Sequence, residues 1–193
     1  MKNLRNLSGA LLLAILTLAC PEAQAQVKPF KITGGGVAPD GLPLPGQPGR
    51  SHWSVGNASQ LGKYAGDGTV KTDSAVYDPS TGTFAGEFGS GSPYNFTAAN
   101  GDELVCYYGR TDKGADEPGT FELTIVGVSP DGFPIVEALF IAEFVPQPEL
   151  STGKFAGVTG SWIMYAWTEP FILGSSDPIE YTWEGTGSLT FPQ

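Results

Sequence analysis

The sequence predicts an all-β protein: a closed antiparallel barrel of roughly eight strands with a Gly/Pro-rich N-terminal extension. Runs rich in β-branched and aromatic residues alternate with turn signals, and no segment keeps a helical apolar period over three turns. A phrase of the form Gly-x-aromatic-Ala-Gly occurs at 62–66, 82–86 and 153–157. Such glycines let a strand bend at a barrel corner while the ring fills the space beneath. The copies have no fixed spacing, which disfavours a solenoid or propeller.

Residues 1–25 have the composition of an export signal. Lys2 and Arg5 precede an apolar stretch at 11–19, and a run of small residues ends at Ala25. This order of segments predicts cleavage after Ala25 and an exported protein, either periplasmic or extracellular.

The sequence has two cysteines, Cys20 and Cys106. Cys20 allows an alternative in which the mature chain begins with a lipid-bearing cysteine, although Thr17 and Leu18 fit that signal poorly. With Cys20 removed, Cys106 has no disulfide partner. It shares a face with Leu104 on an expected strand and has no neighbouring cation to activate it, so we predict a buried, unreactive thiol.

Residues 26–50 are rich in glycine and proline, above all at 34–36 and 40–49. Because proline lacks an N–H and glycine weakens a strand, we expect no ladder here. The segment is predicted to be an extended lead-in that either lies over the barrel or is disordered. The barrel domain is therefore placed at 51–193.

The barrel strands are expected wherever β-forming runs lie between turn signals such as Asp131-Gly132. The expected strands are 52–55, 61–65, 69–77, 82–88, 94–98, 103–108, 120–128, 133–145, 154–158, 161–168 and 179–191. Many short strands joined by tight turns are typical of a sandwich or a barrel.

The run 133–145 favours the barrel, because small and large apolar residues alternate on one face, as a tapering interior requires. These inward residues are Val136, Ala138, Phe140, Ala142 and Phe144. The opposite face also carries aliphatic residues, namely Ile135, Leu139 and Ile141. A row of them outside predicts either a covering lead-in or a contact in a homo-oligomer.

The charge balance excludes two classes of partner. The formal net charge is −10, and the few basic residues are scattered, so nucleic acid is not expected to bind. Beyond the export signal, the longest apolar run, 138–142, is far too short for a membrane-spanning helix. An outer-membrane barrel is disfavoured because polar residues at 71–73 and 122–124 interrupt any lipid-facing band.

The segment 151–161 resembles the G-x-F-x-G-x-x-G element of the allene oxide cyclase and dirigent-like β-barrel superfamily. Residues 83–84 and 96–102 also resemble exported bacterial barrels of this type. The resemblance implies an eight-stranded antiparallel barrel, often trimeric, with an apolar lumen, over about 51–191. The shared motif is structural, so it implies no catalytic residue.

Chemical candidates are few, and we expect no cofactor and no metal site. His52 is the single histidine, so a site with several imidazoles is excluded, and its strand neighbour Ser51 points to the opposite face. We interpret His52 as an ordinary residue at the start of a strand. Glu137 and Glu143 lie about 20 Å apart along one strand, too far for glycosidase chemistry. The acidic residues at 112–117 match no calcium loop and are expected to be solvated.

Aromatic residues are the remaining candidates for a binding site. Rings inside a barrel hold apolar ligands, and Tyr and Trp add a polar group for orientation. The same rings are equally able to fill the core. The candidate lining residues are Phe140, Phe144, Trp162, Tyr165, Trp167, Tyr181 and Trp183.

Two hypotheses about function follow. The first is an exported binding or self-assembling module without catalytic residues, with a small apolar molecule as its ligand. The alternative, which the family resemblance permits, is a cyclase or isomerase acting on a lipid-like or phenolic substrate in the lumen. Fold alone does not separate the two.

Overall fold

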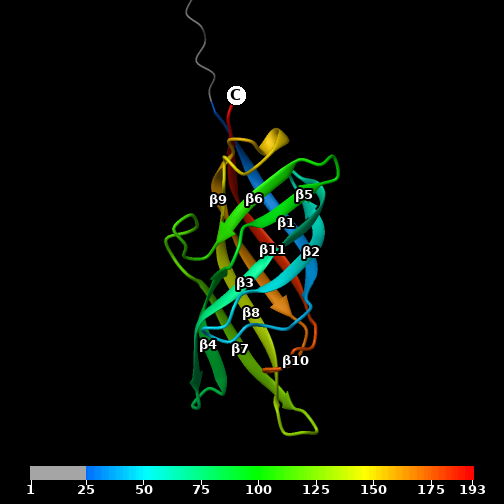
Figure 1. Cartoon of the computed structure of the whole chain (residues 1–193), viewed down its shortest axis with the longest axis vertical. Helices are drawn as coiled ribbons and strands as arrows, with labels where there is room; N and C mark the ends of the chain where they lie inside the picture. Colours follow the sequence, from blue (N-terminus) through cyan, green and yellow to red (C-terminus); the bar gives the residue numbers. More distant parts are fainter. Residues whose placement is uncertain (1–24) are drawn as a thin grey trace, which may run out of the picture.

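The computed structural model describes residues 25–193, which form one sheet of eleven antiparallel strands (Figure 1). In chain order the strands are β1 (Gln26–Ala38), β2 (Arg50–Ala58), β3 (Gly62–Asp78), β4 (Thr83–Ser90), β5 (Tyr94–Ala98), β6 (Glu103–Tyr108), β7 (Gly119–Val128), β8 (Pro134–Pro146), β9 (Thr159–Thr168), β10 (Phe171–Ile172) and β11 (Ile179–Phe191), with a 3₁₀ turn, η1 (Gly153–Phe155), before β9. Within these residues no helix has the length and apolar character to cross a membrane. Most of the predicted export signal, including Cys20, lies outside the described residues.

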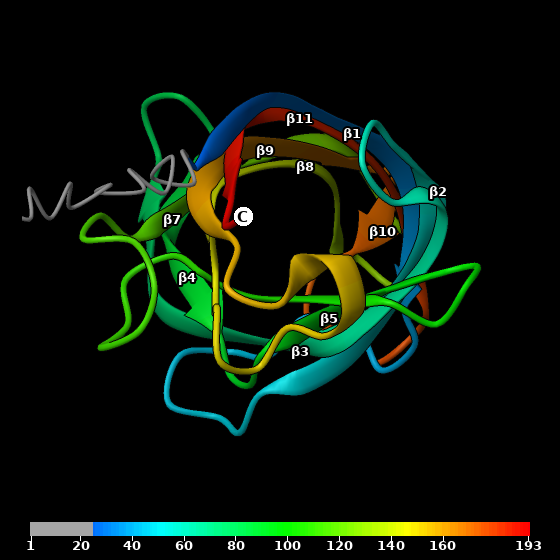
Figure 2. The ribbon, with the colours of Figure 1, turned by 90° about the horizontal axis from the view of Figure 1, so that it is seen from above.

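Eight of the strands close into a hydrogen-bonded ring in the order β1, β2, β3, β5, β6, β8, β9, β11. Figure 2 shows this ring of strands from above. The prediction of an all-β, roughly eight-stranded antiparallel barrel is confirmed. Two sequence observations therefore predicted the architecture: small and large residues alternate along 133–145, and no segment has a helical period.

Two long strands change partners along their length, so the two ends of the barrel differ. Residues 64–67 of β3 pair with β5, whereas residues 70–78 pair with β4. In β8, residues 144–146 pair with β6 and residues 134–141 pair with β7. We call the β5–β6 end, which also carries η1, the upper end, and the β4–β7 end the lower end (Figure 1).

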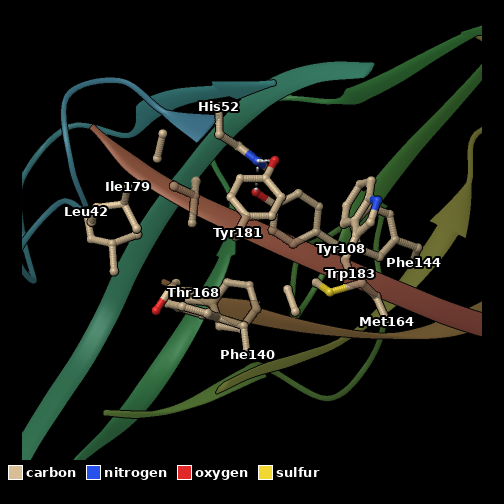
Figure 3. A pocket seen from close by; sticks show the side chains of 14 residues that line it. Leu42, His52, Tyr108, Phe140, Phe144, Met164, Thr168, Ile179, Tyr181 and Trp183 are labelled. Atoms are coloured by element: carbon tan, nitrogen blue, oxygen red, sulfur yellow. Dashed lines mark hydrogen bonds between the residues drawn. The ribbon is translucent and has the colours of Figure 1, made fainter. Parts of the chain in front are cut away.

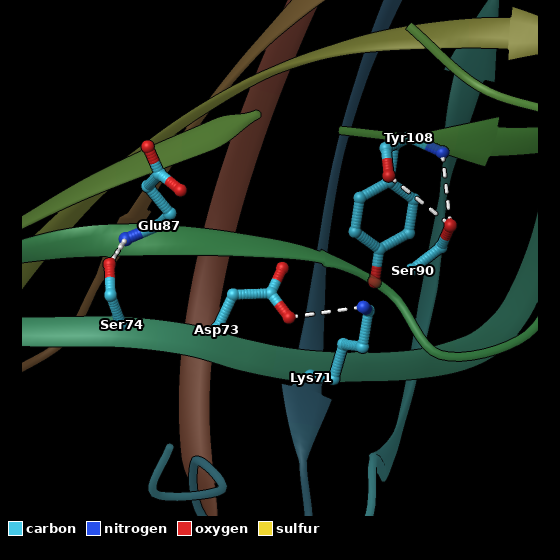
Figure 4. A network of polar contacts seen from close by, with 6 residues as sticks. All are labelled: Lys71, Asp73, Ser74, Glu87, Ser90 and Tyr108. Atoms are coloured by element: carbon cyan, nitrogen blue, oxygen red, sulfur yellow. Dashed lines mark hydrogen bonds and ion pairs between the residues drawn. The ribbon is translucent and has the colours of Figure 1, made fainter. Parts of the chain in front are cut away.

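We call the region where β3 and β8 change partners the strand fork. Hydrogen bonds there hold β4 and β6 close together (Figure 4). The hydroxyl of Ser90 donates to the Tyr108 carbonyl (3.2 Å) and accepts the Tyr108 N–H (3.3 Å), so the end of β4 stays attached to β6. The register of β3 shifts between Thr72 and Ser74, and the Ser74 hydroxyl accepts the N–H of Glu87 (3.1 Å). Such a bulge bends its strand, which lets β3 follow two partners.

Side chains alternate between the lumen and the outside as the sequence predicts. On β8, Val136, Ala138, Ala142 and Phe144 are buried, and Phe140 packs against the same core. On β7, Phe121 and Leu123 are buried, while the alternate residues Thr120, Glu122 and Thr124 are exposed.

The prediction that residues 26–50 form no ladder is wrong for the first half of that segment. Residues 26–38 are β1, which pairs with β11 along its whole length and with β2 over residues 32–37. The barrel therefore begins at Gln26, not at Ser51. Only residues 39–49 are a loop, as their composition predicts.

The glycines of β1 and β2 do not break the sheet, and three of them, Gly34, Gly36 and Gly56, make room for a large aromatic side chain on a neighbouring strand. Gly34 stands opposite Trp183 and Gly36 opposite Tyr181. A Cβ on Gly36 would lie 2.6 Å from the Tyr181 hydroxyl oxygen and closer still to the Trp53 carbonyl. Since real side chains do not approach so closely, these positions accept glycine alone.

The repeated Gly-x-aromatic-Ala-Gly phrases begin at turns, and not at the barrel corners that the sequence predicted. Gly62 and Gly82 have φ of +68° and +71°, and each ends the turn that leads into a strand. The third copy lies on η1 and its flanking turn, so the strand expected at 154–158 is wrong. The strands expected at 61–65 and 69–77 are a single strand, β3.

Replacing Gly36 with Ala is expected to lower the free energy of unfolding by about 2–3 kcal/mol, because the new methyl group overpacks the Tyr181 hydroxyl. Gly127→Ala on β7 is the matched control. Its new Cβ would find its nearest neighbours, atoms of Ile135, at 3.8 Å, so its effect should stay within about 0.5 kcal/mol. Chemical denaturation followed by tryptophan fluorescence measures both, and equal effects would contradict the packing argument.

Candidate functional site

The upper half of the lumen is filled by aromatic rings. Phe144 stacks on Trp162 with ring centroids 5.3 Å apart and on Tyr108 at 4.7 Å, and Phe30 packs against Trp162 at 4.7 Å. Residues 147–158, which include η1, follow β8 at this end (Figure 2). Phe155 from this segment is completely buried in the same core. The upper half is therefore a packed aromatic core.

The lower half contains a cavity of about 60 Å³ in the barrel interior (Figure 3). Its wall is mostly apolar and includes Val70, Phe88, Phe140, Phe144, Met164 and Ile179. The polar groups on the wall belong to His52, Tyr108, Thr168, Tyr181 and Trp183. We call this space the inner cavity.

A second cavity of about 310 Å³ lies between the inner cavity and solvent at the lower end. Leu42 and Phe140 line both spaces, so the two are neighbours. The wall of this outer cavity includes Leu44 and Tyr77, which are 51% and 46% exposed. The outer cavity therefore forms the mouth of the lumen.

The loop of residues 39–49 covers part of this mouth. The side-chain oxygen of Gln47 accepts the N–H of Leu44 (3.0 Å) and a guanidinium N–H of Arg50 (3.3 Å), and Arg50 also donates to the Asp40 carbonyl. These bonds fold the loop back on itself between β1 and β2. As a result Leu42 is held against both cavities.

His52 stands on the wall of the inner cavity between two tyrosines (Figure 3). Its Nδ1 lies 3.0 Å from the hydroxyl of Tyr181 on β11, and its Nε2 lies 3.0 Å from the hydroxyl of Tyr108 on β6. Three strands far apart in sequence thus bring their polar groups to one point. A neighbouring pair, Ser54 and Tyr94, shares a hydrogen bond of 2.7 Å.

Burial controls the protonation of this cluster. Desolvation lowers the pKa of His52 to about 4, so its imidazole is neutral at pH 7. Desolvation also raises the pKa of Tyr108 and of Tyr181, and a Coulombic effect of Tyr94 adds to both shifts. The cluster is therefore uncharged at neutral pH, with every phenol protonated.

The structure divides the predicted lining residues into three groups. Phe140, Phe144, Tyr181 and Trp183 line the inner cavity. Trp162 is buried in the packed upper core. Tyr165 and Trp167 lie on the outer face of β9, where they are 39% and 42% exposed, so neither contributes to the lumen. Since alternate residues of a strand face opposite sides, Trp162 could not share a face with these two.

His52 is the residue that sequence reasoning missed. It lies near the start of β2, as expected, but its interpretation as an ordinary residue did not foresee that its ring lines the inner cavity. The one signal available in the sequence was that it is the single histidine. The structure shows that Ser54, two residues later on the same face of β2, is buried. Its partner Tyr181 is 129 residues away, so no local pattern reveals the contact.

The other chemical candidates stay apart. Cys106 is fully buried and forms no disulfide within residues 25–193, and burial raises its thiol pKa, as expected for an unreactive cysteine. Glu137 and Glu143 point outward on β8. The described part of the chain contains no group of three His, Cys, Asp or Glu residues that could hold a metal ion.

This chain matches no family model, no curated protein and no solved structure. The resemblance to the allene oxide cyclase and dirigent-like barrels therefore stays a prediction, as do export and oligomer formation.

The low pKa of His52 predicts that acid destabilises the fold before the carboxylates titrate. The unfolded chain protonates this imidazole near pH 6.5 and the folded protein only near pH 4, so unfolding takes up a proton between these values. The free energy of unfolding should therefore fall by about 2 kcal/mol between pH 7.5 and pH 5. His52→Gln should lack this component.

Denaturant titrations of the wild type and the variant at both pH values measure this difference. An NMR titration that places the pKa of His52 in the folded protein near 6.5 would contradict the account.

Proposed function

We propose that this protein is an exported binding protein for a small, uncharged, mainly apolar molecule held in the lower half of the barrel. One observation carries the proposal. Among the residues that line the two adjoining cavities there is no Lys, Arg, Asp or Glu side chain, although the chain carries a formal net charge of −10. Ligand sites are typically concave and apolar with a few placed polar groups, which describes this space.

The lack of charge on the walls also sets the class of ligand. An ionised group brought into the lumen would lose its hydration and meet no opposite charge, which is a large energetic cost. An apolar molecule, by contrast, gains roughly 25 cal/mol for each Å² of surface that it removes from water. The cavities therefore favour neutral ligands over charged ones of the same shape.

The asymmetry of the lumen supports binding over a purely structural role. Aromatic side chains pack against one another in the upper half, whereas in the lower half large rings such as Phe121 and Phe140 line the cavities without closing them. The strand fork creates this difference, because at the lower end β4 and β7 replace β5 and β6 in the wall. The cyclase or isomerase hypothesis stays an alternative that would use the same space.

N-phenylnaphthylamine and its sulfonated analogue anilinonaphthalene sulfonate test the proposal, because they share one ring skeleton and differ in charge. We expect the neutral probe to bind at least about tenfold more tightly, as measured by its fluorescence increase. Equal binding of the two probes would contradict an uncharged site.

Two substitutions locate the binding. Ala75 lines the outer cavity, so Ala75→Trp should block the mouth and abolish binding of the neutral probe. Ala85→Trp places the same ring on the outer surface of the adjacent strand β4 and should leave binding unchanged. Unchanged binding in Ala75→Trp would place the probe elsewhere on the protein.

A further inference from the structure

His52 is at the centre of a chain of four polar contacts at the wall of the inner cavity. The Tyr181 hydroxyl oxygen lies 3.2 Å from the Trp53 carbonyl oxygen and 3.0 Å from His52 Nδ1. On the other side, His52 Nε2 lies 3.0 Å from the Tyr108 hydroxyl oxygen, which is 3.0 Å from the Thr69 carbonyl oxygen. The chain thus begins and ends at a backbone carbonyl, which only accepts hydrogen bonds.

These four contacts have only three protons to share. A neutral imidazole carries one N–H, and each of the two phenols carries one O–H. Burial keeps His52 neutral and both phenols protonated at pH 7, so no fourth proton is present. One of the four contacts is therefore left without a donor.

Four arrangements satisfy three of the contacts, and two of these pair both ring nitrogens of His52. In the first, His52 Nε2–H donates to Tyr108, Tyr108 donates to the Thr69 carbonyl, and Tyr181 donates to His52 Nδ1. The contact without a proton is then the one between Tyr181 and Trp53, which is also the longest of the four. In the second, Nδ1–H donates to Tyr181, Tyr181 donates to Trp53, and Tyr108 donates to Nε2.

Both arrangements leave the same imbalance. All three donors are used within the chain, while one phenol oxygen accepts no hydrogen bond from within it. The hydroxyls of Tyr94, which is hydrogen-bonded to Tyr181, and of Ser54 do not remove the shortage, because they add two protons and also two contacts.

The other polar groups of the inner cavity are paired elsewhere. The indole N–H of Trp183 donates to Tyr64 (2.7 Å), and the hydroxyl of Thr168, which lies away from the three rings, accepts the Ala138 N–H (2.9 Å) (Figure 3).

From this imbalance we infer that the inner cavity selects a neutral ligand that donates a hydroxyl proton, an alcohol in preference to an ether. This inference rests on the proposed binding function and names the class of its ligand. In the first arrangement the ligand O–H donates to the Tyr181 oxygen, and its apolar part extends along the lumen toward the mouth. An ether oxygen at the same place has no proton to donate, so its lone pairs would repel those of the Tyr181 oxygen.

The isomers n-octanol and heptyl methyl ether test the inference, because they have the same atoms and differ in the O–H group. Each is titrated against bound N-phenylnaphthylamine, and displacement of the probe gives the affinity. We expect the alcohol to bind about fivefold to tenfold more tightly. The ether loses less hydration than the alcohol on entering an apolar site. If the alcohol formed no hydrogen bond in the cavity, the two isomers would therefore bind equally or the ether would bind more tightly, and either result overturns the inference.

Tyr181→Phe removes the accepting oxygen and should bring the ratio of the two affinities to one or below, while the probe still binds. Tyr165→Phe is the matched control, since it removes a phenol oxygen on the outer face of β9 and should leave the ratio unchanged. A ratio that survives Tyr181→Phe overturns the assignment to this oxygen.

The two proposals fail in different ways. If neither isomer displaces the probe, or the neutral probe does not bind at all, the proposed function fails. If both isomers displace it equally, the lumen still binds apolar molecules and only the selection of a hydroxyl donor is wrong. The comparison in the wild type alone decides this point, so it holds even if Tyr181→Phe does not fold.

Discussion

The structure depends on the close fit of large aromatic rings against glycines on neighbouring strands. Gly34 faces Trp183, Gly36 faces Tyr181, Gly66 faces Phe96, Gly86 faces Phe121 and Gly187 faces Trp162 across the ladders. At Gly34, Gly36, Gly86 and Gly187, a Cβ would lie within 2.7 Å of the facing residue. A narrow barrel has little interior volume, so a large ring fits only where the adjacent strand gives up its side chain. The same pairing lets a glycine-rich segment act as a barrel strand.

This fit also explains why the polar cluster exists where it does. Without a side chain at Gly36, the ring of Tyr181 can lean across β1 and bring its hydroxyl to the Trp53 carbonyl and to His52. Tyr64 uses the space above Gly34 and Gly56 in the same way and reaches the Thr33 carbonyl and the Trp183 indole. Packing and hydrogen bonding are thus coupled, because the space that admits each ring also places its polar atom.

The contrast between Tyr181 and Trp167 shows where sequence reasoning on the site succeeds and fails. Both are aromatic residues on late strands, and composition alone treats them alike. Alternation places Trp167 on the same face of its strand as Tyr165 and on the opposite face from the buried Trp162, and the sequence alone shows that these three could not all line the lumen. The role of Tyr181 could not have been found this way, since it depends on His52 and Tyr108, which reach it through two other strands.

The sequence by itself determined the all-β class, the inward face of β8 and the buried state of Cys106, because these follow from alternation and hydrophobicity within a few residues. Only the tertiary structure decided that 26–38 is a strand, that the lumen is filled at one end and open at the other, and that His52 lies between two phenols. Each of these depends on which strands become neighbours. That choice is made by packing across the closed sheet, where contacting residues are far apart along the chain.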